Sequence, residues 1–500
     1  MSETKFLRFF DFTGGLNTKS PVTALSLNQA LDLQNINLLP SGGFEKRRGN
    51  SVFNSSAMNS GANVQGLGYF KLSSGSDFLV AISGDKIYKS DDLDGTMDDI
   101  TGAVSIASGQ NNIWTNSAMN DLIIFVGGAP DAPVKYSGSG NAAALGGSPP
   151  QGKFGIMANN YFFIGNTTAN PSRIQWSIFG NPEDWTGTGS GSHDVQKNDG
   201  DTLVGGTLLG LDNMVLFKEN SVHLLNIRTP PFPLFPLFRG TGAISPLGIV
   251  NVNGVVYFIT PEPRMYATDG TNIIGFPDAL DDVWDDLNKL RLKYIHGQYY
   301  KRLNQIMWFA SSSSATKHDV CIVWDLNRKA WLRHPKGHNM NVSCIAQNRL
   351  LYAGGYDGKI YRQDAPSVYL DNSETSTTID AFWRSGWYGF EKEILSKTGL
   401  YADLNFTTQS SGSFEFSYGF DFSEDRRTEI ISMAAVGDVY GTGIYGTSVF
   451  GGQTDRMTLR HMGGAGKFFQ FAIRNRNASQ QFAFNGAVIA MIENEPKAMA

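Results

Sequence analysis

The chain has few of the residues that form cross-links or metal centres: among 500 residues there are two cysteines and seven histidines. Cys321 and Cys344 both lie in apolar, strand-like contexts, so we interpret them as buried thiols on neighbouring strands in preference to a disulfide. His334 and His338 have the i, i+4 spacing of a zinc-binding helix, but Pro335 and Gly337 lie between them and break any helix. We therefore predict neither a zinc centre nor any other cofactor.

The chain also lacks a surplus of basic charge and any long apolar run. Its formal net charge is −5, which argues against a free-standing nucleic-acid-binding protein but not against one that nucleic acid merely passes. No run of about 18 apolar residues occurs, so we expect no membrane span. Met1 to Phe10 contain charges and no apolar core, so we expect no secretory signal.

Glycine and aromatic residues, by contrast, are plentiful. The 56 glycines and the 12% aromatic content indicate many tight turns joined by short strands, and helix is expected to be scarce. Five hundred residues are too many for one ordinary hydrophobic core. The length therefore favours one large β domain with one or two smaller ones.

A strand–turn–strand pattern recurs between about Asn63 and Asp364. Gly84 to Tyr88 (GDKIY) is matched by Asp357 to Tyr361 (DGKIY), and each follows an apolar, alternating run. A Gly/Asp turn between two such runs is typical of a hairpin with a two-residue loop. Weaker copies lie between these two, and the residues that close the pattern are Tyr88, Tyr136, Trp176, Leu224, Tyr266, Trp324 and Tyr361.

The spacing of the closing residues indicates the architecture. They are 48, 40, 48, 42, 58 and 37 positions apart, and an interval of this size has room for about four short strands. Such intervals are typical of propeller blades, whose radial stacking covers both faces of every blade. We therefore predict an all-β fold with a β-propeller of six or seven blades over residues 61–392. The alternative is a large β-sandwich with irregularly spaced hairpins.

The segments on either side of the repeat have different patterns. Residues 1–60 form an N-terminal arm, with an expected hairpin of strands 35–39 and 44–48, and we expect this arm to dock with the C-terminal domain. Residues 393–500 are predicted to form an antiparallel β-sandwich. Its alternating strands are expected at 400–406, 413–420, 428–432, 457–461, 468–474 and 482–492.

One helix is predicted within the repeat, from Pro277 to Leu292 with Asp278 as its cap, because apolar residues recur there at helical spacing. Aspartates at positions 281, 282, 285 and 286 occupy its other face. We interpret them as a solvated face in preference to a metal or acid–base pair.

The first fifty residues resemble a known family. The motifs are Asp11 to Asn17 (DFTGGLN), Pro21, Leu25 to Leu33, Asn35, Gly42 to Phe44 (GGF) and Arg47 to Gly49 (RRG). Together they resemble the opening of the tail nozzle proteins of short-tailed double-stranded-DNA phages, which are also distal tail-tube or DNA-stabilisation proteins. That family combines an amino-terminal arm, a propeller and a carboxy-terminal β domain, so the resemblance extends loosely over the whole chain.

The resemblance implies a structural virion protein of the phage tail, made in the host cytoplasm. Copies of the chain, with six as the expected number, would form a ring that closes the DNA channel until infection and then lets the genome pass. The implied partners are the tail adaptor or tube protein and tail fibres or spikes, with double-stranded DNA crossing the lumen without sequence-specific binding. A propeller that binds a receptor or a glycan is the alternative function.

A proline-rich segment is the first candidate for an interface or for the channel wall. Thr229 to Phe238 contains four prolines, which exclude a helix and an interior strand. The segment is therefore extended and presents three phenylalanines, Phe232, Phe235 and Phe238. Their side chains contact either a partner or the chain's own propeller.

Two further candidates are a basic cluster and a loop. The cluster of Lys46, Arg47 and Arg48 either contacts DNA phosphates or an acidic partner, or is simply solvated. The glycine-rich loop from Gly437 to Gln453 suits contact with a neighbouring subunit or a constriction of the passage. Its aromatic residues are Tyr440, Tyr445 and Phe450.

No catalytic motif is complete. Gly463 to Phe468 has the wrong glycine spacing for a phosphate-binding loop, and Asp91 to Gly95 lacks ligands that a calcium loop requires. Some propellers are glycosidases that use two carboxylates, so a propeller glycosidase stays an alternative. We predict that the protein is not an enzyme.

Overall fold

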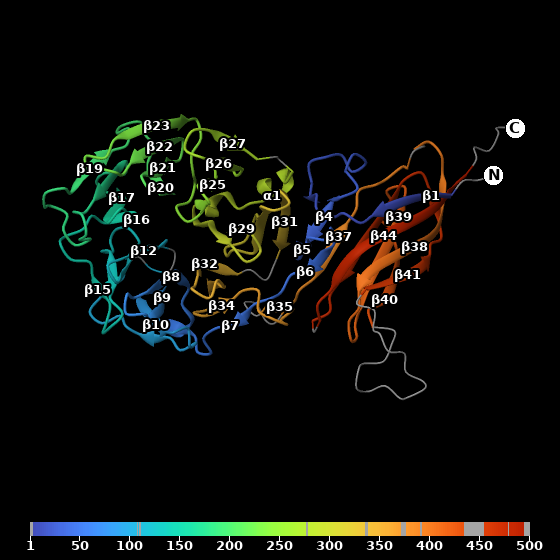
Figure 1. Cartoon of the computed structure of the whole chain (residues 1–500), viewed down its shortest axis with the longest axis horizontal. Helices are drawn as coiled ribbons and strands as arrows, with labels where there is room; N and C mark the ends of the chain where they lie inside the picture. Colours follow the sequence, from blue (N-terminus) through green and yellow to red (C-terminus); the bar gives the residue numbers. More distant parts are fainter. Residues whose placement is uncertain are drawn as a thin grey trace.

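The computed structural model describes residues 4–107, 109, 112–276, 279–335, 339–371, 377–390, 393–434, 455–478 and 480–494. Across these residues the chain forms strands β1 to β44, one short α-helix and two 3-10 helices. Figure 1 shows a ring of strands at one end of the molecule and two layered sheets at the other. The prediction of a nearly all-β chain is confirmed.

The ring consists of four-stranded antiparallel sheets, seven of them among the described residues. In the first six sheets the four strands are consecutive in the chain. These sheets are β8 (Val64–Lys71), β9 (Asp77–Ser83), β10 (Lys86–Asp91), β11 (Asp98–Asp99); β12 (Thr115–Met119), β13 (Leu122–Val126), β14 (Val134–Tyr136), β15 (Ala143–Ala144); β16 (Gly152–Ala158), β17 (Tyr161–Thr167), β18 (Arg173–Trp176), β19 (Gly191–Asp194); β20 (Leu203–Leu209), β21 (Asn213–Lys218), β22 (Ser221–Asn226), β23 (Leu234–Arg239); β24 (Val250–Val252), β25 (Val255–Ile259), β26 (Met265–Thr268), β27 (Ile273–Gly275); and β28 (His296–Tyr300), β29 (Gln305–Ala310), β30 (Val320–Asp325), β31 (Ala330–Pro335).

The seventh sheet takes its outer strand from the N-terminal arm. Its strands β32 (Met340–Ile345), β33 (Leu351–Gly355) and β34 (Ile360–Arg362) are joined by β7 (Ser51–Val52), which pairs with β34. In addition, Asn54 Oδ1 accepts a hydrogen bond of 2.7 Å from the backbone N of Ile360. A segment from before the first sheet therefore completes the last one.

The sheets form a closed circle. The first strand of each sheet contacts the first strand of the next, from β8 and β12 round to β28 and β32, and β32 contacts β8 in turn (Figure 1). Buried apolar clusters lie between neighbouring sheets and cover their faces. Successive antiparallel sheets around a closed circle are the topology of a β-propeller.

The sequence repeat marks one strand in each sheet. All seven closing residues fall on third strands, namely β10, β14, β18, β22, β26, β30 and β34. Gly84 and Asp85 form the predicted two-residue loop, because Ser83 pairs with Lys86. The matching turn near the end is wider than predicted, since Gly354 pairs with Ile360. The side chain of Asp357 holds this wider turn by accepting from the backbone N of Lys359 at 3.2 Å.

Two further sheets are built from both ends of the chain (Figure 1). The larger sheet contains β41 (Asp455–His461), β38 (Lys397–Thr407), β44 (Ala483–Glu493), β6 (Phe44–Lys46) and β5 (Ile36–Leu38), with β1 (Thr4–Phe9) on β44 and β42 (Ala465–Gly466) on β38. The smaller sheet contains β4 (Asp32–Gln34), β37 (Ala381–Arg384), β43 (Phe469–Asn475), β39 (Ser413–Phe420) and β40 (Arg427–Ser432). Short pairs are formed by β2 (Gly15–Leu16) with β3 (Gln29–Ala30) and by β35 (Leu370–Asp371) with β36 (Thr377–Thr378). We call the two larger sheets together the terminal sheets.

Aromatic side chains fill the space between the terminal sheets. Phe9 of β1 packs edge-on against Phe471 of β43 with ring centroids 4.8 Å apart, and Phe406 of β38 packs in the same way on Phe414 of β39 at 5.0 Å. Each such pair contributes about 0.5–1.5 kcal/mol beyond the burial of its area. The arm supplies β1, β5 and β6 to one sheet and β4 to the other, so it is part of this core, and β5 pairs with β6 as the predicted hairpin.

The predicted helix from Pro277 to Leu292 is wrong in length. The chain forms α1 (Asp281–Asp285) and then the separate 3-10 helix η2 (Lys289–Tyr294); the other 3-10 helix is η1 (Met58–Gly61). Asn288 interrupts the helix because its backbone is extended and its side chain accepts from the backbone N of Leu290, starting η2. Leu290 is consequently 86% exposed rather than on a buried face. The predicted cap, Asp278, lies outside the described residues.

Both cysteines are free thiols, as predicted, but they are not on neighbouring strands. Cys321 is buried on β30, whereas Cys344 is half-buried on β32 of the next sheet.

Candidate functional site

Arg47, directly after β6, is buried where the ring meets the terminal sheets. Its Nη1 and Nη2 lie 2.9 and 2.5 Å from the two carboxylate oxygens of Asp371 on β35, and its Nε donates to Asn35 Oδ1 at 2.8 Å. A paired guanidinium and carboxylate with two parallel hydrogen bonds is strongly directional. The pair therefore fixes the arm to the segment through which the chain leaves the ring.

The rest of the basic cluster is also largely internal. Lys46 Nζ donates to Asn475 Oδ1 at 3.2 Å and to Asn477 O at 2.6 Å, and burial lowers the pKa of Lys46 to about 7. Arg48 is half-buried. Lys46 and Arg47 thus serve contacts inside this chain, and Arg48 is the member of the cluster that keeps substantial exposure.

Asp32 on β4 forms a second link across the same junction. Its Oδ1 accepts from Arg333 Nη2 at 2.9 Å, and its Oδ2 lies 3.5 Å from Arg384 Nη2. Arg333 belongs to β31 of the ring and Arg384 to β37 of the terminal sheets. We call Arg47, Asp371, Asp32, Arg333 and Arg384 together the joint.

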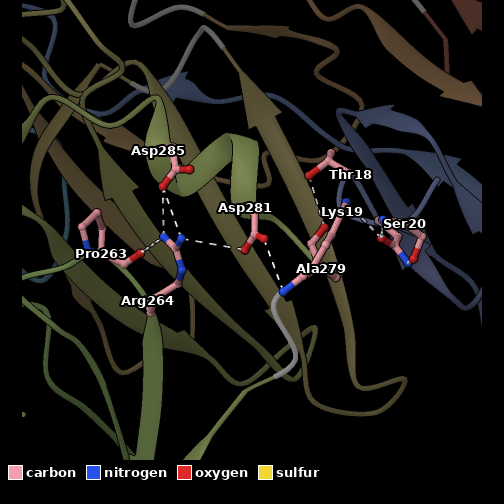
Figure 2. A network of polar contacts seen from close by, with 9 residues as sticks. Thr18, Lys19, Ser20, Pro263, Arg264, Ala279, Asp281 and Asp285 are labelled. Atoms are coloured by element: carbon pink, nitrogen blue, oxygen red, sulfur yellow. Dashed lines mark hydrogen bonds and ion pairs between the residues drawn. The ribbon is translucent and has the colours of Figure 1, made fainter. Parts of the chain in front are cut away.

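A third polar contact lies where the arm passes α1, as Figure 2 shows. Lys19 Nζ is 3.4 Å from Asp281 Oδ2, while Arg264 Nη2 is 3.8 Å from Asp281 Oδ1 and 3.3 Å from Asp285 Oδ1. Two of the aspartates interpreted as a solvated face are therefore paired. Because all four side chains keep partial exposure, each pair stabilises the fold only weakly.

The proline-rich segment divides between the core and the surface. Phe232 is fully buried, with its ring centroid 5.0 Å from that of Trp176, so it packs on its own propeller. Pro236 lies in β23, which is the outer strand of its sheet and tolerates a residue without a backbone donor. Phe235 and Phe238 are 53% and 41% exposed and remain candidates for a partner surface.

The three aromatic residues predicted at the tip of the loop from 437 to 453, Tyr440, Tyr445 and Phe450, lie outside the described residues. That part of the sequence prediction stays a prediction.

A cavity of about 530 Å³ lies between the first strands of the ring. Its lining comes from β8, β12, β16, β20, β28 and β32 and from the segment just before β24. Within the described residues this lining contains no lysine, arginine, aspartate or glutamate. A neighbouring cavity of about 290 Å³ does have charges in its lining, from Lys153, Glu219 and Lys293.

Buried histidines gather between the sixth and seventh sheets. His296 stacks on Phe309 with ring centroids 4.6 Å apart, and His318 Nδ1 lies 2.7 Å from Met340 O. Burial lowers the pKa of His318 to about 4 and that of His334 to about 3, and it holds the pKa of His296 well below its ordinary value. All three imidazoles are therefore neutral at pH 7.

The carboxylates of the calcium-like segment are used locally. Asp91 Oδ2 is 2.5 Å from Lys89 Nζ, and Asp94 Oδ1 accepts from the backbone N of Thr96 at 2.8 Å and from Ser90 Oγ at 3.0 Å. Over the described ranges, no three His, Cys, Asp or Glu side chains are placed to hold a metal ion. Over the same ranges, no helix has the length and apolar character needed to cross a membrane.

Sequence reasoning missed Asp32 and Asp371, which complete the joint. Their arginine partners are 301 and 324 positions away, so no local spacing connects them. The available signal was an acid within an apolar strand context at each position, since such an acid is rarely left without a partner.

Comparison with known proteins identified structures of similar shape but no relatives by sequence. No protein-family model and no curated protein matches the chain. The similar structures include YCF48 from Cyanidioschyzon merolae (TM-score 0.42, 11% identity, 63% of this chain and 98% of that one) and BamB from Moraxella catarrhalis (0.39, 14%, 67% and 97%). A third is the Cps50 (Swd1) β-propeller domain from Myceliophteria thermophila (0.41, 10%, 63% and 99%). With similarities this distant, the propeller assignment rests on the topology of the chain itself.

Proposed function

We propose that the chain is a structural subunit of the tail nozzle of a short-tailed phage. The observation that carries the proposal is the joint: the arm, whose motifs resemble those of nozzle proteins, is held where the ring meets the terminal sheets by the buried Arg47–Asp371 pair and the partly buried Asp32–Arg333 pair. Such an arm makes the two β parts one rigid strut, which suits a protein whose task is mechanical.

In this proposal the seven four-stranded sheets are seven propeller blades and the terminal sheets are a β-sandwich. The arm (1–60), the propeller (61–392) and the C-terminal domain (393–500) then act as one body. The propeller's sheets are already covered by their neighbours, so the contacts between copies fall to the arm and the terminal sheets.

The free edge of the terminal sheets supports this assignment. β41 is an edge strand of the larger sheet and β40 is an edge strand of the smaller one. Three large apolar side chains on them are exposed: Ile430 by 74%, Met457 by 56% and Leu459 by 54%. Exposed apolar edge strands are templates for association, and a ring requires one such face to meet a different face of the next copy.

A ring of these subunits, with six as the proposed number, would hold the packaged genome and open on infection. The net charge of −5 suits a wall that DNA must run past, since each cation–phosphate contact would add affinity. The protein is proposed to be a virion component without enzymatic activity, in contact with the tail adaptor and with fibres or spikes.

The test is assembly. Purified protein is mixed with the tail adaptor protein of the same phage and imaged by negative-stain electron microscopy. Rings with a central passage, docked on the adaptor, are the expected result. A protein that stays monomeric and unbound, or that hydrolyses members of a glycoside panel, would contradict the proposal.

A second candidate function, binding of a glycan or host-surface receptor by the propeller, is favoured by one observation. It is the cavity between the first strands of the ring, whose described lining carries no charged side chain.

A further inference from the structure

Two polar side chains in the lining of the 530 Å³ cavity have no hydrogen-bond partner in the described chain. Both ring nitrogens of His296, a residue only 2% exposed, are buried without a partner, as is the hydroxyl of Ser343. His296 lies on β28 and Ser343 on β32, and these two strands are in contact. Buried polar atoms in proteins are normally satisfied, so this side of the cavity is suited to a bound polar group.

Two further lining residues offer hydrogen bonds that the fold does not use. The side chains of Thr207 and Gln298 make no hydrogen bond across the described residues, and both are half-buried, so solvent reaches them. Other polar residues of the lining are already engaged: Asn116 Nδ2 donates to Leu67 O at 2.9 Å. The groups that the fold leaves unsatisfied are therefore one imidazole, two hydroxyls and one amide; the imidazole nitrogens and the Ser343 hydroxyl become reachable from the cavity only when their side chains move.

The chemistry of these groups selects the ligand class. A neutral imidazole, a hydroxyl and an amide each donate and accept hydrogen bonds, and burial keeps His296 neutral by holding its pKa far below the ordinary value. An ionic ligand would lose its hydration without meeting an opposite charge, because the described lining has none. Hydroxyl groups, which also both donate and accept, match the lining.

Apolar surface in the cavity adds to this match. Phe154, Ile156 and Leu208 line the same space, and a sugar presents C–H faces as well as hydroxyls. The volume falls in the range of roughly 300–1,000 Å³ that is usual for small-molecule sites. We propose that this cavity is a binding site for a neutral sugar, with His296, Ser343, Thr207 and Gln298 as its hydrogen-bonding groups. The site goes beyond the nozzle function and does not depend on ring assembly.

The experiment compares neutral and charged sugars of the same ring size. Purified protein at pH 7 is titrated calorimetrically with glucose, galactose and trehalose, and with glucuronate and glucosamine as their charged counterparts. Saturable binding of at least one neutral sugar is expected, with the charged counterparts bound at least tenfold more weakly. Equal binding of neutral and charged sugars, or no binding of any of them, overturns the proposal.

Variants place the binding in the cavity. Ser343→Ala and His296→Phe, each made alone, are expected to weaken binding of the neutral sugar at least fivefold, whereas Ser314→Ala, an exposed loop position, leaves it unchanged. His296→Phe keeps the stack on Phe309, so it is expected to fold. Unchanged affinity in both folded variants, or density for water alone in crystals saturated with the sugar, also overturns the proposal. Ring assembly with the adaptor is measured without sugar, so its failure and that of the sugar site are separate results.

Discussion

Arg47 and Asp371 lie 324 positions apart and form an ion pair in which both side chains are only 5% exposed. One belongs to the arm and the other to the segment that follows the ring. Because a buried pair must repay the desolvation of two charges, it contributes little net stability when intact, yet loss of one partner leaves the other charge buried without its counter-ion. The pair thus specifies one way in which the arm packs against the segment that follows the ring.

Arg47→Met is expected to lower the free energy of unfolding by about 3–5 kcal/mol, because Asp371 would remain buried and charged. Urea denaturation measures the change. The double variant Arg47→Met/Asp371→Leu is expected to recover most of the loss. Arg173→Met serves as the matched control, since its pair with Asp194 is partly exposed and is worth less than about 1 kcal/mol. A single variant at position 47 as stable as the control would contradict this account of the joint.

The arm's contact with α1 is predicted to behave differently. A double-mutant cycle of Lys19→Ala and Asp281→Ala is expected to give a coupling below about 1 kcal/mol, because Lys19 is 52% exposed. Hydrogen exchange of the Thr18 amide, which donates to Ala279 O at 2.7 Å, reports whether this part of the arm detaches locally. In the Lys19→Ala and Asp281→Ala variants, the Thr18 amide is expected to exchange faster than in the wild type while the free energy of global unfolding stays unchanged. A loss of unfolding free energy as large as that of Arg47→Met would contradict this expectation.

Two phenylalanines of one segment are predicted to have opposite effects. Phe232→Ala removes a fully buried ring and should cost about 3–5 kcal/mol in unfolding free energy. Phe235→Ala, at a position that is 53% exposed, should change it by less than about 0.5 kcal/mol. Thermal and urea denaturation of both variants check this difference, and equal effects would show that the segment packs differently.

Features that depend on neighbouring residues could be predicted from the sequence, whereas contacts between residues far apart in the chain could not. The repeat located the third strand of each of the seven sheets in the ring, because alternation and Gly/Asp turns such as Gly84-Asp85 depend on neighbouring residues alone. The helix predicted from Pro277 to Leu292 was too long. Its apolar spacing favours a helix, but the extended backbone of Asn288 interrupts it. The joint could not be predicted from the sequence, since Arg47 and Asp371 are brought together only by the completed ring.

The buried histidines predict a loss of stability in acid. In the unfolded chain a histidine titrates near pH 6.5, whereas the folded pKa values of His318 and His334 are about 4 and about 3, because burial disfavours the charged form. The unfolded state therefore binds more protons below pH 6.5, and stability falls as the pH is lowered from there toward the folded values. Each histidine contributes about 1.4 kcal/mol per pH unit within that window.

His296→Phe isolates this effect. The substitution removes a titrating group whose ring nitrogens make no hydrogen bond to any residue that the structure describes, and it retains the stack on Phe309. Urea unfolding at pH 7, 6 and 5 should show a shallower decline for the variant than for the wild type, and the difference between the two removes the contribution of the carboxylates. Parallel declines would mean that burial does not lower the pKa of His296 in the folded protein.

The free edge of the terminal sheets gives the sharpest test of ring formation. Met457→Lys/Leu459→Lys places two charges on β41 at side chains that are 56% and 54% exposed, so the subunit should keep its stability within about 0.5 kcal/mol. If β41 meets the next copy, burying these charges without partners is unfavourable and rings should be lost in negative-stain images. Leu211→Lys, at an 86% exposed position between β20 and β21, is the control and should assemble normally. Rings that form equally well from all three proteins would exclude this edge as the contact, because two buried lysines cannot be accommodated there without a measurable cost.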